Sequence, residues 1–122
     1  MITGIPDGGS LYEFTTDDGF HVSLHEARCR QIVVNPMALS LKIVFDLDPE
    51  TADEAARQVT YDFADARIDD WCDEGDGPHQ VPIETRGQVS NFSLSADRYF
   101  VLETLNMTMY FEASTLDVRV SR

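Results

Sequence analysis

A β-strand can be recognised directly in the sequence Leu39-Ser40-Leu41-Lys42-Ile43-Val44-Phe45-Asp46-Leu47-Asp48. Its odd-numbered residues are all large and apolar, whereas most of its even-numbered residues are polar or charged. A period of two places the first set on one face of a strand and the second set on the other. The incoming arm covers residues 28–34 and ends in Val33 and Val34, and Asn35-Pro36 separates it from the outgoing arm because proline cannot donate to a strand ladder. Residues 24–48 therefore predict one long β-hairpin.

Alternating runs predict further strands on both sides of this hairpin. The Asp18-Gly19 pair is typical of a hairpin turn, because glycine accepts a positive φ, and apolar runs flank it. The expected strands are residues 11–14, 20–24, 59–63, 89–94 and 99–105, followed by a terminal hairpin of residues 105–111 and 116–120. That hairpin would have one apolar and one polar face.

Two segments are less regular. Residues 49–58 contain Thr51 and Glu54 at the spacing of a capping box, which predicts a turn or two of helix. Residues 65–71 fit both helical and strand spacing, and the sequence leaves that choice open.

The number and length of these runs predict a mainly β fold. About eight short antiparallel strands with at most one or two short helices are typical of a β-sandwich, or of a sheet partly rolled toward a barrel. The 122 residues correspond to a single β-rich domain over residues 1–122, with residues 1–9 as a loose N-terminal lead-in.

The chain is strongly acidic, with 22 acidic against 9 basic residues and a net charge of −13. This charge opposes binding to nucleic acid and to anionic membrane surfaces, and it suits a basic protein partner or simple solubility. The first twenty residues resemble no secretory signal, and no apolar run reaches the roughly 20 residues of a membrane span. We therefore expect a cytoplasmic protein in which Cys29 and Cys72 are buried, reduced thiols, with a single disulfide or a reactive thiol as the alternatives.

The histidines do not predict a metal site. His21 and His25 are four residues apart, which on a strand separates them by about 13 Å. One zinc ion cannot bind both at that distance. His25 and Glu26 are adjacent and would point to opposite faces of the same strand, and His79 has no spacing that links it to the others. We expect no cofactor and no metal.

An acidic segment near residue 70 supplies the candidate interaction surface. It consists of Asp69, Asp70, Trp71, Asp73, Glu74 and Asp76. The segment lacks the ligand pattern of a calcium-binding EF-hand, because Trp71 and Cys72 interrupt the acidic residues and no glutamate closes the loop. Aromatic residues anchor protein interfaces, so Trp71 is the strongest single candidate for contact with a partner, with a place in the core as the alternative.

The sequence His25-Glu26-Ala27, followed by a hairpin and then by Val59-Thr60-Tyr61-Asp62-Phe63, resembles a group of small bacterial β-rich domains. Several members of this group are uncharacterised, and some are similar to immunity proteins that neutralise a co-encoded toxin. The resemblance covers part of the chain and transfers no functional residue. It implies a non-catalytic binding domain whose acidic charge would steer it toward a basic toxin.

The sequence is compatible with three functions. The leading prediction is a non-enzymatic cytosolic protein-binding domain, because neither a nucleophile elbow nor a phosphate-binding glycine loop is present. A small-ligand binder or hydrolase would use a cavity between the sheets and the residues His21, His25 and His79. A structural, self-associating domain would form homo-oligomers through its last hairpin.

Overall fold

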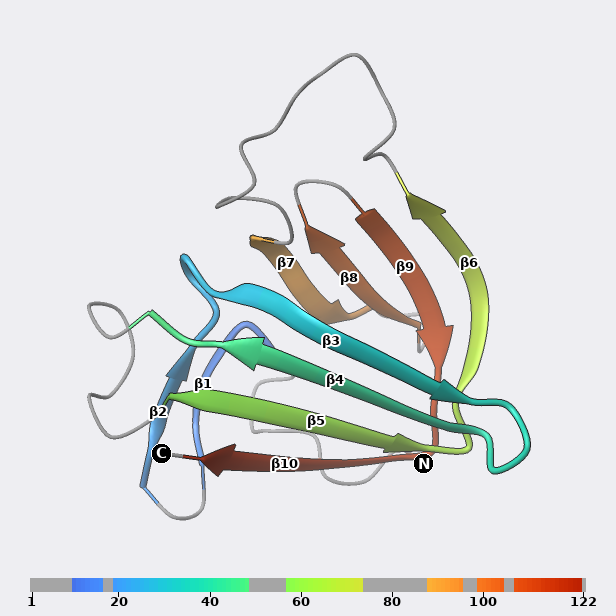
Figure 1. Cartoon of the computed structure of the whole chain (residues 1–122), viewed down its shortest axis with the longest axis horizontal. Coiled ribbons are helices and arrows are strands. Elements are labelled where there is room, and N and C mark those ends of the chain that lie inside the picture. Colours follow the sequence, from blue (N-terminus) through green and yellow to red (C-terminus); the bar gives the residue numbers. More distant parts are fainter. Residues whose placement is uncertain are drawn as a thin grey trace.

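The computed structural model describes residues 10–16, 19–48, 57–73, 88–95, 99–104 and 107–121, with only the backbone at residues 72 and 73. Every regular element in these residues is a β-strand (Figure 1). None of the described residues forms a helix with the length and apolar character needed to cross a membrane. The predicted lead-in at residues 1–9 and most of the predicted helix, residues 49–56, lie outside this described part.

The strands form two four-stranded antiparallel sheets and one small hairpin. The first sheet has the order β10 (Thr115–Ser121), β5 (Gln58–Ala64), β4 (Ser40–Asp46) and β3 (Arg28–Asn35). The second has the order β6 (Arg67–Asp73), β9 (Met107–Glu112), β8 (Phe100–Thr104) and β7 (Val89–Leu94). The hairpin consists of β1 (Glu13–Thr15) and β2 (His21–Ser23). The mainly β, sandwich-like fold predicted from the sequence is confirmed.

The central hairpin is confirmed in its core and corrected at its ends. β3 and β4 pair as the two arms of the expected hairpin, with Ile32 opposite Ile43, and the alternating residues from Leu41 to Leu47 are buried. Leu39 was predicted to share that buried face, but it lies in the turn with a φ of 51° and is 40% exposed. Residues 24–27 also form a turn, in which the Ala27 amide donates to the Leu24 carbonyl.

Aromatic side chains from both large sheets fill the space between them. Ring centroids of neighbouring pairs lie 4.8–6.4 Å apart among Phe14, Phe45, Tyr61, Phe63, Phe92, Phe100 and Phe111. The Tyr61 hydroxyl is fully buried and donates to the Leu11 carbonyl at 2.7 Å, so it also ties the chain that leads into β1 to this core. Such packing is worth more than the buried area alone, because aromatic edges and faces attract each other.

The prediction of a terminal hairpin is wrong. β9 pairs with β6 and β8 in the second sheet, whereas β10 pairs with β5 in the first. The chain bends between Glu112 and Thr115, and it bends in the same way between Ala64 and Arg67, where Asp65 has a φ of 52°. The two bends stay in register, because Ala64 is opposite Thr115 and Arg67 is opposite Glu112. Paired strands that change sheets at a common corner are typical of orthogonally packed sheets, and Figure 1 shows the two sheets crossing steeply.

A second contact joins the sheets at the start of β3. Arg28 forms an isolated bridge with Gln88, and the Val89 amide donates to the Ala27 carbonyl at 3.0 Å. Together with the bent corner, this contact makes the sandwich partly rolled. The outer strands of the two large sheets are β3, β10, β6 and β7.

Candidate functional site

Four of the six residues of the candidate interaction surface lie on β6, an outer strand of the second sheet. The side chains of Asp69, Asp70 and Trp71 are all exposed there. Asp73 is the last residue of the strand and is described by its backbone only, whereas Glu74 and Asp76 lie outside the described residues. The open choice between helix and strand at residues 65–71 is thus resolved as strand from Arg67 onward.

A bulge in β6 determines how these side chains are directed. Ile68 is opposite Phe111 and Asp70 is opposite Tyr110, which leaves Asp69 as the extra residue between two paired ones. Opposite residues in an antiparallel ladder project to the same face. Trp71 therefore shares a face with its buried partner Met109, but its position on the outer strand leaves it 44% exposed. Trp71 is neither a core residue nor a freely solvated one.

Tyr110 lies beside Asp70 at this edge and was not identified from the sequence; it projects to the outer face of the sheet, whereas Trp71 projects to the face of Met109. It lies opposite Asp70 on the outer face of the sheet and is 39% exposed. The alternation of residues 107–111 does place Tyr110 on the polar face of its strand, but only the pairing of β9 with β6 brings it beside Asp70. We use the name acidic edge for Asp69, Asp70, Trp71 and Tyr110.

His21 and His25 lie on the surface, at and just after the β1–β2 hairpin. His21 Nε2 is 3.2 Å from Glu13 Oε1 across the two strands. His25 Nδ1 is 3.4 Å from the Tyr12 hydroxyl, and His25 Nε2 is 3.8 Å from Glu26 Oε1. The prediction that His25 and Glu26 point to opposite faces is wrong, because the strand ends at Ser23 and Glu26 has a φ of 65° in the following turn. His79 lies outside the described residues.

These contacts form a short surface row rather than an enclosed catalytic group. The side chains of His25 and Glu26 are 64% and 50% exposed. Partial burial raises the pKa of Tyr12, and the negative charges of Glu26 and Glu13 add to that rise, so the phenol stays protonated at neutral pH. Within the described part of the chain, no group of three or more His, Cys, Asp or Glu side chains is placed to hold a metal ion.

Cys29 is a free thiol on β3. It lies opposite Phe45 and packs against the core, and this burial raises its pKa from 9.0 to about 11, although a hydrogen bond with the Gln31 backbone acts in the other direction. A thiol with such a pKa is protonated at neutral pH and is a poor nucleophile. The side chain of Cys72 is outside the described residues.

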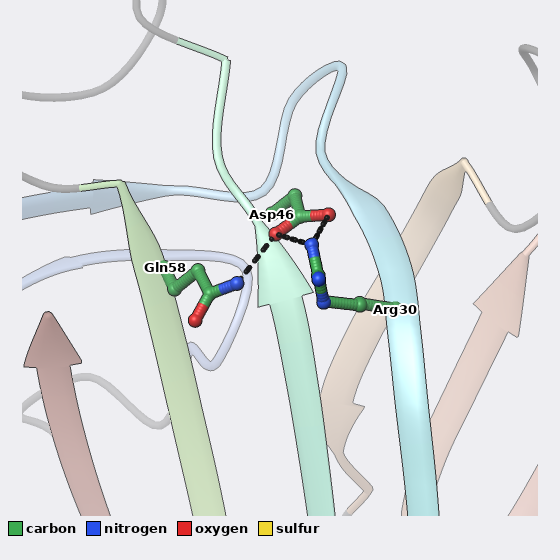
Figure 2. Close-up of polar contacts among 3 residues, drawn as sticks. All are labelled: Arg30, Asp46 and Gln58. Carbon is green, nitrogen blue, oxygen red and sulfur yellow. Dashed lines mark hydrogen bonds and ion pairs between the residues drawn. The ribbon is translucent and has the colours of Figure 1, made fainter.

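Several charges of the first sheet form pairs with one another. Figure 2 shows Arg30 of β3 beside Asp46 of β4, with Arg30 Nη1 3.2 Å from Asp46 Oδ2, and Gln58 of β5 donating to Asp46 Oδ1 at 2.9 Å. Arg119 of β10 pairs with Asp62 of β5, which also lies opposite Asp117. These exposed pairs reduce repulsion between the strands and are each worth little in stability.

Comparisons with protein-family models, with curated proteins and with solved structures found no significant match to this chain. The candidate site therefore depends on the geometry described above.

Proposed function

We propose that this protein is a non-enzymatic, cytoplasmic protein-binding domain that recognises a basic partner through its acidic edge. The observation that carries the proposal is Trp71, a large aromatic side chain left 44% exposed on an outer strand beside two exposed aspartates. Tryptophan and tyrosine are the side chains that contribute most to protein interfaces, because they bury a large area at little cost in conformational entropy.

The charge of the whole chain supports the same partner class. A net charge of −13 attracts a basic protein over a distance of several ångströms and increases the rate at which the two proteins meet. The two aspartates of the acidic edge would then contact lysine or arginine directly. One specific form of the proposal is an immunity protein that neutralises a co-encoded basic toxin, such as a nuclease.

The proposal is tested by isolating a partner and measuring its affinity for matched variants. The protein is used to capture basic proteins from an extract of its native host, and each captured protein is then identified, purified and titrated. We expect Trp71→Ala to weaken binding at least about tenfold, as truncation of an interface anchor does. The double change Asp69→Asn and Asp70→Asn should also weaken binding. Its loss of affinity relative to the unmodified protein should grow as the salt concentration is lowered, because low salt strengthens the attraction that the two aspartates provide.

Asp117→Asn is the matched control, because it removes an exposed acidic charge from β10 of the other sheet. It should leave the affinity within about twofold of the unmodified protein, since a distant surface charge contributes little. Trp71→Phe, which keeps an aromatic ring, separates loss of the contact from loss of the fold. If no basic protein is retained at low salt, or if a retained partner binds all four variants equally, the proposal is wrong.

A further inference from the structure

Among the residues that the structure describes, the second half of β3, residues 31–35, is an outer edge without the usual protection against pairing. On the side away from β4, the only backbone pairing of β3 within the described part of the chain is at its start, through the bridge of Arg28 to Gln88. The bulge at Arg30 is likewise confined to the first half. Gln31-Ile32-Val33-Val34-Asn35 then continue as a regular ladder with no charge, bulge or proline. An outer strand of this kind is a template for another strand.

The other outer strands of the two large sheets carry the protection that this half of β3 lacks. β6 has its bulge at Asp69 and a second aspartate next to it. β7 has a bulge at Ser90 and a bridge between Ser93 and Ser10. β10 carries exposed charges at Asp117 and Arg119. The exposed apolar stretch of β3 is therefore a local feature and not a general property of the fold.

The side chains of this edge would pack against an added strand. Ile32 and Val34 lie opposite the buried residues Ile43 and Leu41, so they face the core side of the sheet, yet Val34 is 43% exposed. Val33, on the other face, is 40% exposed. Apolar residues at every second position of an added strand would cover Ile32 and Val34 and extend the core by one strand.

The turn after β3 fixes the edge in place. The Asn35 side-chain oxygen accepts hydrogen bonds from the amides of Met37 and Ala38, both at 3.2 Å, and the Leu39 carbonyl accepts one from Ala66 at 2.7 Å. Met37, at the tip of this turn, is 94% exposed. Figure 1 shows the turn projecting beyond β5 and β10 at that end of the sheet. A surface held in one conformation loses little entropy when it binds.

The segment that carries this edge is basic, in contrast to the chain as a whole, although Arg28 lies opposite Asp46 and Lys42 lies opposite Asp62 in the ladder. Residues 27–45 contain three of the nine basic residues, Arg28, Arg30 and Lys42, and none of the 22 acidic ones. In the described part of the chain, Arg28 and Lys42 form no ion pair. Lys42 lies opposite Val33 on the outward face of the sheet. A strand added beyond β3 would be about 10 Å from β4, and the extended side chains of Lys42 and of a glutamate on the added strand can together span that distance.

We propose that residues 31–35 of β3 accept an extended segment of another protein as a fifth strand of the first sheet, and that this segment alternates acidic with apolar side chains. Its backbone would pair with β3, its apolar side chains would cover Ile32 and Val34, and its acidic side chains would approach Lys42 and Arg28. Recognition by strand addition works in this way, with backbone pairing for affinity and alternate side chains for specificity. The site is separate from the acidic edge, so either proposal can fail without the other.

Two capped nine-residue peptides test this assignment, one alternating valine with glutamate and the other alternating valine with lysine. Binding is followed by the amide resonances of the full-length protein. We expect the glutamate peptide to shift the resonances of residues 31–35 and to bind at least about tenfold more tightly than the lysine peptide, because like charges oppose contact. Equal binding of the two peptides, or shifts confined to β6 or β10, would overturn the proposal.

Variants at exposed positions separate the two parts of the recognition. Val33→Glu should lower the affinity for the glutamate peptide about tenfold, because it places a negative charge on the edge that pairs with a negatively charged peptide. Ser121→Glu adds the same charge to β10 at the opposite edge of this sheet and should have little effect. Lys42→Gln should weaken binding by about threefold, as loss of an exposed ion pair does. Arg67→Gln removes an equal charge from the other sheet and is its control.

A second copy of the chain is the alternative occupant of this edge. Sedimentation would then show a dimer at high protein concentration that Val33→Glu converts to a monomer, and this result would overturn the assignment to an acidic partner segment. A monomer at all concentrations that binds the glutamate peptide supports it.

Discussion

Tyr61 shows how a single residue joins three parts of this molecule. Its ring packs 5.4 Å from that of Phe45 in the same sheet and 5.0 Å from that of Phe92 in the other. Its hydroxyl donates to the Leu11 carbonyl at 2.7 Å. Burial raises the pKa of Tyr61 well above 10.0, because the charged phenolate would be desolvated. The residue therefore holds together both sheets and the chain that leads into β1.

We predict that Tyr61→Phe lowers the free energy of unfolding by about 1–2 kcal/mol, because the buried Leu11 carbonyl loses its donor. The substitution also changes the dependence on pH. An unfolded tyrosine ionises near pH 10.0, whereas the folded one stays neutral, so stability that is fully present below pH 10 is lost as the pH rises above it. The Phe variant should lose less stability over that range. Urea denaturation at pH 8 and at pH 10.5 measures both effects.

Tyr110→Phe is the control for this comparison, because Tyr110 is 39% exposed and lies on the outer face of its sheet. It should change the stability at pH 8 by less than about 0.5 kcal/mol. An equal loss in the two variants would contradict the role assigned to the buried hydroxyl.

At the scale of elements, the paired bends explain how short strands form a closed core. β5 continues into β6, and β9 continues into β10, through two neighbouring bends that carry both chains from one sheet to the other. The Ser114 amide donates to the Ala64 carbonyl at 3.0 Å between the bends. Asp65 has a φ of 52°, which aspartate accepts more easily than most residues and which β-branched residues avoid.

We predict that Asp65→Val destabilises the protein by about 1–2 kcal/mol, whereas Asp65→Gly is neutral or stabilising by up to about 1 kcal/mol. Valine is strained at a positive φ, and glycine is not. Asp117→Val is the control, because Asp117 is also exposed but lies within β10, where a β-branched residue is favourable. Thermal unfolding of the three variants measures the difference. Equal midpoints for the two Asp65 variants would show that the bend imposes no backbone constraint.

At the scale of the whole molecule, the distribution of charge separates two surfaces. The acidic edge on β6 carries the carboxylates that suit a basic partner, whereas residues 27–45, which include all of the β3–β4 hairpin except Asp46, contain no acidic residue. With 22 acidic and 9 basic residues, negative charges outnumber positive ones by 13. The mutual repulsion of the negative charges favours the expanded, unfolded chain.

We therefore predict that sodium chloride stabilises the protein. Raising it from about 10 mM to about 500 mM shortens the Debye length from about 30 Å to about 4 Å and screens this repulsion. The free energy of unfolding in urea should rise by about 1 kcal/mol or more. Potassium chloride at the same concentration should act equally, since ionic strength is the cause. A constant or falling stability would mean that attractive pairs such as Arg30 with Asp46 outweigh the repulsion.

The acidic edge illustrates what could be predicted of the site. The residue types at Asp69, Asp70 and Trp71 identified it as a candidate, because aromatic and charged residues close together are typical of interfaces. The sequence could not predict the face of the sheet to which each of these side chains projects, because the bulge at Asp69 shifts the alternation of all residues that follow it. Tyr110 could not be predicted as a neighbour either, because its contact with this edge depends on the pairing of two strands that are distant in the chain.

The sequence alone determined that the protein is mainly β and which side chains are buried within most strands, because apolar residues alternate at a period of two over β4, β5, β9 and β10. Only the tertiary structure decided which strands are neighbours. Residues 107–121 have the pattern of a hairpin, yet β9 and β10 belong to different sheets. The physical reason is that alternation records which face of a strand is apolar but not what that face packs against. The same two-faced strands can pair with each other, or bend at a corner and close the core between two sheets.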